Sequence, residues 1–526
     1  VTWSVTGSGS ISSTGVYLAP SAFPSPNTAT VTATSGSQTG TASIAVVFPN
    51  DNAGVQSIPI KLGTSGGNTL DNSTDGKSCC IGTLGSLWSR GTAVNNLFIL
   101  SNNHVLARSS LGKAGENIDQ PGQPGCPSLQ GTNVANLTEQ AALKPTAGTA
   151  PGPCRGSTAP ICGLAPSNVD AAIAQIVPTT VDTSGTILDL GSPGASSIAA
   201  APPSSTLANI PTVVATDARV AKSGRTTGLT CSTVQAALVD GVVVDYDQSC
   251  GGAIAFSAVF NGQVVVNGGT FSAGGDSGSL IVTADTSEPV ALLFAGNTAS
   301  TVGNPVSDVI KAFTQAGPPV VAPAIVGGAD HAVSCDPTAQ TQSVQVGAQS
   351  VAVSARQQQL AENARAHQAI ALMSSEPAIR SVKVGASSDS PGESALLIEL
   401  KSLPKNRVPA IVEGVRTKVV YAQGVIAPAM SSQEFQRGAG AKSAHLNELL
   451  QPGIQGVGVG RSDDSPGESA IVIYTIKGEA HQPIPAMIDG VRTKIVEGER
   501  FRASHWNPKL EQEIGSCPKA RTANKK

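Results

Sequence analysis

The stretch "FSAGGDSGSLIV" at residues 271–282 places a serine between an aspartate and a glycine, directly before an apolar run. Glycines let the backbone turn tightly, and the run that follows has the length and composition of a buried strand. Ser277 is therefore either a surface hydroxyl in a turn or a nucleophile. A serine hydroxyl is a poor nucleophile near neutral pH unless a base, oriented by a carboxylate, lies beside it. A nucleophilic Ser277 thus requires a base, an acid and a suitable scaffold elsewhere in the chain.

Histidine is the usual base for a serine nucleophile, and one histidine stands apart from the others. His104 lies in "FILSNNHVLA" (98–107), at the end of an apolar run and before a turn of small residues. The chain has six histidines, and five of them follow residue 330. Within the region that holds Ser277, the base can only be His104. The other five are His331, His367, His445, His481 and His505.

Several aspartates are candidates to orient His104, and their surroundings distinguish them. In "SNVDAAIAQI" (167–176), Asp170 directly precedes a buried strand, where its carboxylate can be held at a barrel junction. Asp119 lies in a segment rich in glycine and proline, and Asp182 and Asp189 lie in polar turns. We therefore predict that Asp170 is the acid.

The region 50–316 is predicted to be a mainly β unit, a double antiparallel β-barrel. It contains apolar runs of strand length, separated by loops rich in glycine and proline, as barrel walls require. Near its end, "NPVSDVIKAFTQ" (304–315) predicts a closing helix. The predicted strands include 96–101, 171–177, 241–246, 263–268, 279–283 and 290–296.

Residues 1–49 and 317–345 are predicted to flank this unit. In 1–49, β-branched residues alternate with small polar ones, which favours the antiparallel strands of a sandwich. Runs such as "VTWSV" and "TASIAVV" resemble the later strands of bacterial immunoglobulin-like domains. We therefore interpret 1–49 as a truncated domain of that kind, whose first strands precede this fragment. Proline and glycine in "AGPPVVAPAIVGG" (316–328) indicate a linker over 317–345.

The rest of the chain contains a repeat. "DSPGESA" occurs in both 382–400 and 457–475, and "EGVRTKVV" (413–420) matches "DGVRTKIV" (489–496). We predict two small α/β units, 346–425 and 426–526 with the C-terminal tail. Each is expected to run helix, strand, turn, strand, short helix, strand. The helices are predicted over 354–376, with Ser354 as N-cap, and over 441–451.

The "DSPGES" turns have two interpretations. They could bind a cation, or they could be structural turns; two carboxylates per turn are few for Ca²⁺, which favours the structural interpretation. The sequence leaves three roles open for the repeats: binding a target, assisting folding, or restraining the β unit. The carboxylates concerned are Asp389, Glu393, Asp464 and Glu468.

Composition limits the environment and the partners. A formal net charge of -3 gives no reason to expect nucleic acid or an anionic membrane as partner, and no apolar window is long enough to span a membrane. Nine cysteines without C-x-x-C spacing favour a secreted or cell-surface protein with disulfides and one remaining thiol over a zinc site. Cys231–Cys250 and Cys335–Cys517 are the pairings we hypothesise.

The order His104, Asp170, Ser277 is that of the chymotrypsin clan, and "KSGRTTGLT" (222–230) resembles the Ser-Gly-x-Thr-Thr-Gly segment of bacterial α-lytic and streptogrisin-type serine proteases. The resemblance implies a double β-barrel serine endopeptidase that needs no cofactor or metal. Ser277 would attack the scissile carbonyl of a protein or peptide substrate, His104 would transfer the proton, and Asp170 would fix the imidazole tautomer. The amides of Gly275 and Ser277 would form the oxyanion hole.

The same resemblance implies a specificity pocket, with Phe271 at its base and Phe294, Ala295 and Gly296 along its wall. Such a pocket would prefer apolar side chains. The chain also departs from the family pattern. Ser279 replaces a second glycine, and the cysteine expected before the Thr-Thr-Gly block is absent, which leaves the partner of Cys231 open.

Other classes of protein were weighed against the peptidase. A Gly-Asp-Ser-Leu esterase needs its serine early and an Asp-x-x-His late, and an α/β-hydrolase needs Gly-x-Ser-x-Gly; the chain has neither pattern. A non-enzymatic alternative remains: an extracellular adhesion or binding protein that keeps the barrels as an inactive scaffold, since a fold does not guarantee chemistry.

Overall fold

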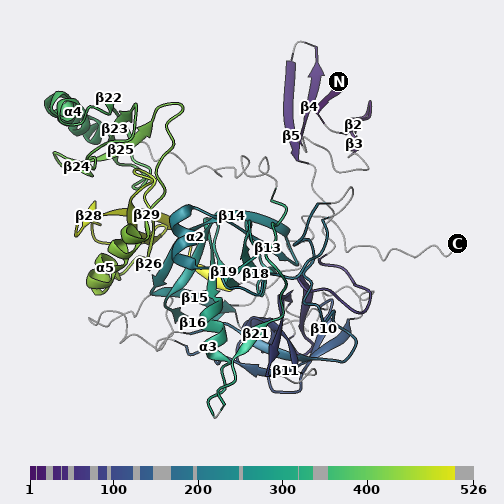
Figure 1. Cartoon of the computed structure of the whole chain (residues 1–526). Coiled ribbons are helices and arrows are strands. Elements are labelled where there is room, and N and C mark those ends of the chain that lie inside the picture. The colour runs from purple at the N-terminus through teal and green to yellow at the C-terminus, as the bar shows by residue number, and fades with distance from the viewer. Residues whose placement is uncertain are drawn as a thin grey trace.

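The computed structural model is mainly β, with 44% strand and 14% helix, and contains a closed six-strand barrel and a half-barrel (Figure 1). No helix among the described residues is long and apolar enough to cross a membrane. The structure describes residues 1–7, 9–18, 28–36, 38–45, 52–71, 81–91, 96–122, 131–145, 168–193, 198–247, 253–317, 319–335 and 353–503.

The half-barrel is an antiparallel sheet of eight strands in the order β21-β8-β9-β12-β11-β10-β6-β7. Apolar side chains from its strands pack around Trp88, which is fully buried. The strands are β6 (Thr64–Asn68), β7 (Gly82–Leu84), β8 (Ser86–Arg90), β9 (Leu97–Ser101), β10 (Asn117–Gln120), β11 (Thr132–Gln140), β12 (Ala172–Ile176) and β21 (Pro323–Ile325).

The closed barrel is a ring of six antiparallel strands, β13-β14-β17-β20-β19-β18, in which β18 pairs back onto β13. A hairpin of β15 and β16 lies beside this ring. The strands are β13 (Arg219–Gly224), β14 (Gly228–Asp240), β15 (Val242–Asp247), β16 (Ile254–Phe260), β17 (Gln263–Asn267), β18 (Leu280–Thr283), β19 (Pro289–Gly296) and β20 (Ser300–Pro305).

The predicted strands of this region are confirmed: the apolar runs correspond to β9, β12, β15, β17, β18 and β19. The predicted closing helix is also present, as α3 (Val306–Ala312). Two short helices were not expected, α1 (Asn103–Leu106) and α2 (Ile210–Thr216). Both have fewer than two full turns inside a β region, so they give no periodic apolar pattern to recognise.

The N-terminal segment forms short antiparallel strands, as its alternating pattern predicts. The immunoglobulin-like assignment stays a prediction. A three-stranded sheet has the order β1-β4-β5, and β2 pairs with β3. The strands are β1 (Thr2–Gly7), β2 (Ser10–Ile11), β3 (Tyr17–Leu18), β4 (Thr28–Ser35) and β5 (Gln38–Ala45).

The two repeats share one order of elements, a helix followed by four strands. The helix predicted over 354–376 is confirmed, and the Ser354 side chain accepts a hydrogen bond from Gln357 N at 3.3 Å. The first repeat contains α4 (Ala355–Ser375), β22 (Ile379–Ala386), β23 (Ser394–Leu400), β24 (Ile411–Val412) and β25 (Val415–Tyr421). The second contains α5 (Ser432–Leu449), β26 (Ile454–Arg461), β27 (Ser469–Ile476), β28 (Met487–Ile488) and β29 (Val491–Gly498).

Two details of the predicted repeat are wrong. α5 begins at Ser432 rather than near 441, because Gly438 lies inside the helix, where a Cβ would come within 2.9 Å of Val459. In place of the expected short helix, each repeat has a two-residue strand, β24 in the first and β28 in the second. Each forms a tight hairpin with the next strand. Asp489 and Gly490 both have positive φ there, as in a type I′ turn.

The "DSPGES" turns lock the two repeats together by reciprocal contacts. Asp464 accepts hydrogen bonds from Ser387 Oγ at 2.5 Å and Ser388 N at 2.7 Å. Asp389 accepts the equivalent bonds from Ser462 Oγ and Asp463 N. Glu393 pairs with Arg416 and Glu468 with Arg492. These carboxylates are engaged by protein groups, and no cluster in the described part of the chain has three or more metal-binding side chains.

The second repeat continues the sheet of the barrel. β26 pairs antiparallel with β14, with Ala237 opposite Val459. Lys442 Nζ donates to Leu238 O at 2.7 Å. A last strand, β30 (Phe501–Ala503), pairs with both β15 and β19. Figure 1 shows the first repeat, which contains α4, farther from the barrel strands than the second repeat, which contains α5.

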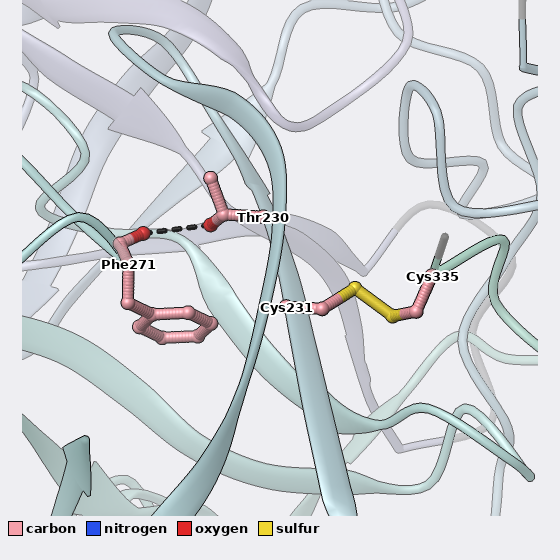
Figure 2. Close-up of a disulfide and its surroundings, with 4 residues drawn as sticks. All are labelled: Thr230, Cys231, Phe271 and Cys335. Atoms are coloured by element: carbon pink, nitrogen blue, oxygen red, sulfur yellow. Dashed lines mark hydrogen bonds between the residues drawn. A yellow bond between two sulfur atoms is a disulfide. The ribbon is translucent and has the colours of Figure 1, made fainter. Parts of the chain in front are cut away.

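Both hypothesised disulfide pairings are wrong, because Cys231 is bonded to Cys335 (Figure 2). The two residues are 104 positions apart, and their Cα atoms are 5.9 Å apart. The chain after α3 returns to the barrel and places Cys335 next to β14, a proximity that sequence spacing cannot reveal. Cys250 and Cys517 lie outside the described residues.

The segment 317–345, which was predicted to be a linker, contains a strand. Within it, β21 pairs antiparallel with β8, with Ala324 opposite Ser89. Val326 N also donates to Leu87 O at 2.8 Å. The proline and glycine content that indicated a linker is compatible with a short edge strand, since an edge strand needs ladder bonds on one side only.

Candidate active site

His104 and Asp170 meet where two neighbouring strands of the half-barrel come together. β9 ends at Ser101, and α1 then carries His104. β12 is antiparallel to β9, with Ala172 opposite Ser101, so the residue just before β12 lies beside the residues just after β9. His104 Nδ1 is 2.6 Å from Asp170 Oδ2, and His104 N donates to Asp170 Oδ1 at 3.1 Å.

Burial makes this arrangement rigid. The side chains of His104 and Asp170 are both 0% exposed. Asn102 Nδ2 also donates to Asp170 O at 2.7 Å, which fixes the backbone of the acid. Since an ionised carboxylate only accepts hydrogen bonds, the short contact places a proton on His104 Nδ1. In the neutral imidazole, Nε2 is then the basic nitrogen.

Tyr246, a residue that the sequence did not single out, completes the acid's surroundings. Its hydroxyl donates to Asp170 Oδ2 at 2.8 Å, so this oxygen receives hydrogen bonds from both Tyr246 and His104. The Tyr246 ring lies edge-on to the His104 ring, with 6.0 Å between the ring centroids, and it stacks on the Phe256 ring with 4.9 Å between centroids. Burial, followed by the Asp170 charge, raises the pKa of Tyr246 well above its ordinary value, so the hydroxyl keeps its proton.

The backbone around Ser277 follows from its flanking glycines. Gly275 and Gly278 have φ of 96° and 97°, a region that disfavours side chains. A Cβ on Gly278 would also lie 2.1 Å from Ser101 Oγ, at the end of β9. Gly-Asp-Ser-Gly is therefore required both by the turn and by its close approach to the half-barrel.

Gly82 brings the Ser277 and His104 segments to one place. A Cβ on Gly82 would lie 2.5 Å from Val105 Cγ2 and 2.8 Å from Ser277 O, so both segments contact this glycine. Thr83 N donates to Ser277 O at 2.8 Å, and Thr83 Oγ1 donates to Gly275 O at 2.9 Å. The half-barrel thus holds the backbone of the serine turn, and it does so on the side that carries His104.

The Thr-Thr-Gly block is explained by Asp276. Asp276 Oδ1 accepts from Thr226 N at 2.8 Å and Thr227 N at 3.1 Å, and Oδ2 accepts from Thr227 Oγ1 at 2.7 Å. Lys222 Nζ lies 3.4 Å from the same carboxylate, and both groups are fully buried. Burial lowers the pKa of Lys222, and the Asp276 charge opposes that change. The block therefore anchors the residue that precedes Ser277.

A cavity of about 630 Å³ opens next to Ser277. Of the predicted pocket wall, Ala295 and Gly296 line this cavity. Phe271 and Phe294 are not among the described residues that line it. Phe271 packs in the barrel core, and the Phe294 ring contacts Phe260 at 4.6 Å. Phe271, predicted at the base of a specificity pocket, and Phe294, predicted along its wall, therefore both lie in hydrophobic cores.

The second repeat supplies the other wall of this cavity. Its strand edges and turns contribute side chains of both charges, and the repeat therefore reaches the candidate site. The lining residues from this repeat and β30 are Ile476, Lys477, Glu479, Glu499, Arg500 and Arg502.

The rejected aspartates are engaged elsewhere. Asp119 lies in β10 rather than in a loop, and Asp182 Oδ1 accepts from Ser184 N at 2.9 Å.

Asp71, which the sequence did not single out, contributes to the electrostatics near His104. Burial raises the pKa of Asp71 to about 7, while the charges of Arg108 and His104 oppose that rise.

No known family model matches the chain, and no curated protein matches it. The interpretation of the site therefore depends on its geometry.

Proposed function

We propose that the protein is a serine endopeptidase of the chymotrypsin clan, secreted or held at the cell surface. The proposal combines the mainly β architecture of barrel and half-barrel with the ordered residues His104, Asp170 and Ser277. The observation that carries it is the buried 2.6 Å contact between His104 Nδ1 and Asp170 Oδ2 beside the turn that holds Ser277.

In the proposed reaction, Ser277 Oγ attacks the scissile carbonyl while His104 Nε2 accepts its proton. Asp170 holds the ring with its proton on Nδ1 and stabilises the imidazolium that forms. His104 then donates the proton to the leaving amine, and water hydrolyses the acyl-enzyme by the same steps. The amides of Gly275 and Ser277 would stabilise the oxyanion, a contribution of about 3–4 kcal/mol per donor in comparable enzymes.

The test is covalent labelling and peptide cleavage by the wild type and Ser277→Ala. The wild type should bind a fluorophosphonate at Ser277 and cleave members of a peptide library, and Ser277→Ala should do neither. Ser279→Ala is the matched control, because Ser279 Oγ donates to Asp276 O at 2.6 Å within the same turn. Folded protein that remains unlabelled, even with the variants described below, would favour the inactive binding scaffold.

A further inference from the structure

β30 occupies a strand edge next to the candidate nucleophile. β18 pairs with β19 as far as Leu280 opposite Leu292, and beyond that point the chain turns at Ser277. Leu293 contacts this turn, because Gly278 N donates to Leu293 O at 2.9 Å. The edge of β19 that β18 leaves open is then filled by β30, with Arg502 opposite Gly296.

The direction of β30 is that of a peptide running toward Ser277. Its pairing with β19 is antiparallel, so the step from Arg502 to Ala503 runs in the direction from Gly296 toward Leu293. An extended peptide that reaches Ser277 along this edge would add to β19 in the same way, by main-chain hydrogen bonds. A substrate and β30 would therefore compete for one strand edge.

Several contacts hold this segment in place. Gln455 Nε2 donates to Glu499 O at 2.9 Å, and Gln455 Oε1 accepts from Phe501 N at 3.1 Å. Asn297 Nδ2 donates to Glu499 O at 2.7 Å, directly beyond the end of β19. Phe501 and Ala503 are buried in the core that includes Tyr246 and Phe294. The segment is thus bound through backbone and core contacts as well as through the cavity wall.

We propose that residues 498–503 of the chain act as an intramolecular inhibitor, because β30 pairs with the edge of β19 at Gly296, along which an extended substrate of the proposed peptidase would bind. This inference rests on the proposed function, and it selects restraint of the protease among the three roles left open for the repeats. A tethered segment of this kind competes at an effective concentration on the order of millimolar, so substrates gain access when β30 leaves.

The test compares full-length variants. Arg502→Pro places proline inside β30, where it removes a backbone donor and disrupts strand pairing. Gln455→Ala removes both side-chain contacts to the segment and leaves its backbone intact. Ile426→Pro is the matched control, because Ile426 is 86% exposed after β25 in the first repeat and is in no strand. Fluorophosphonate labelling and peptide cleavage should be at least about tenfold faster in the first two variants.

A binding measurement separates the two proposals. The peptide of residues 498–503, "GERFRA", should bind Arg502→Pro and inhibit it competitively, and should bind wild type and Ile426→Pro much more weakly. Equal labelling and cleavage rates in wild type and both β30 variants would overturn the inhibitor proposal. If the peptide bound Arg502→Pro but the protein was not labelled, the strand-binding surface would stand and the peptidase proposal would be overturned. If Arg502→Pro showed neither labelling nor peptide binding, both proposals would be overturned.

Discussion

At the scale of single residues, Tyr246 adds a fourth group to the predicted triad. It donates to the same Asp170 oxygen that accepts from His104, and it lies in the buried core that includes Phe260 and Phe501. We describe it as a positioning residue, because it acts on the substrate only through Asp170 and His104.

We predict that Tyr246→Phe lowers kcat by roughly tenfold and leaves KM unchanged, because a hydrogen bond to a charged group contributes about 1.5–3 kcal/mol. With this donor removed, the Asp170 carboxylate is less firmly oriented, so His104 is less well aligned to accept the Ser277 proton. These measurements belong in the Arg502→Pro background, where β30 no longer competes with substrate.

Tyr474→Phe is the control for Tyr246→Phe. Tyr474 is also buried, and its hydroxyl has no hydrogen-bond partner among the described residues. Its substitution should leave kcat and KM unchanged. A Tyr246→Phe enzyme with a full kcat would show that the tyrosine only fills space.

At the scale of elements, the Cys231–Cys335 disulfide fixes the segment after α3 to β14. Cys231 and Cys335 both pack against the core of the half-barrel, and the bond joins the ends of a loop that includes the closed-barrel strands β17, β18, β19 and β20. Closing so long a loop restricts the unfolded chain strongly.

We expect Cys335→Ser to lower the free energy of unfolding by about 2–5 kcal/mol, measured by urea denaturation under oxidising conditions. Cys231→Ser should cost a similar amount, and the double variant should be no less stable than either single one, because all three remove one bond. Additive losses would mean that each cysteine stabilises the fold independently of the disulfide.

The elements also show where sequence patterns suffice. Continuous apolar runs identified β9, β12, β15, β17, β18 and β19, and the capping serine identified the start of α4. The start of α5 could not be predicted, since Gly438 discourages a helix unless it faces a closely packed sheet. The hairpin turns at Glu413–Gly414 and Asp489–Gly490 did carry a signal, because an acidic residue before glycine favours two positive φ angles.

At the scale of the whole molecule, the interface between the repeats buries two carboxylates at the centre of reciprocal contacts. Arg416 donates to Thr493 O and Arg492 donates to Thr417 O, both at 2.8 Å, which repeats the symmetry of the turns. Burial, followed by the Asp464 charge, raises the pKa of Asp389 to about 6. Asp463 adds to this rise, and Lys494 and the Ser462 hydroxyl oppose it.

This shift predicts a pH dependence. Between the ordinary pKa of 3.8 and about 6, the folded state holds the proton more tightly than the unfolded state, so stability falls as pH rises through this window. Above it, the loss is complete and amounts to at most about 3 kcal/mol. Unfolding of the full chain at pH 4, 5, 6 and 7 measures the slope.

Asp389→Asn should reduce the slope between pH 4 and 6, and the remaining slope should include the contribution of Asp71, whose pKa burial raises to about 7. Glu448→Gln serves as control, because its side chain is 80% exposed on α5 and is not part of the interface. An unchanged slope in Asp389→Asn would mean that other groups titrate in this range.

The sequence by itself determined the mainly β architecture and the leading helix of each repeat, and it singled out the three residues of the candidate triad. These features are written in local patterns: apolar runs, capping residues, glycine-flanked turns and the order of a few reactive side chains. Only the tertiary structure decided the partner of Cys231, the contact of Tyr246 with Asp170, and the position of β30 between β15 and β19. Each of these depends on how distant strands pair and pack. Because almost any sequence can form backbone pairs, no local pattern predicts which distant strands will do so.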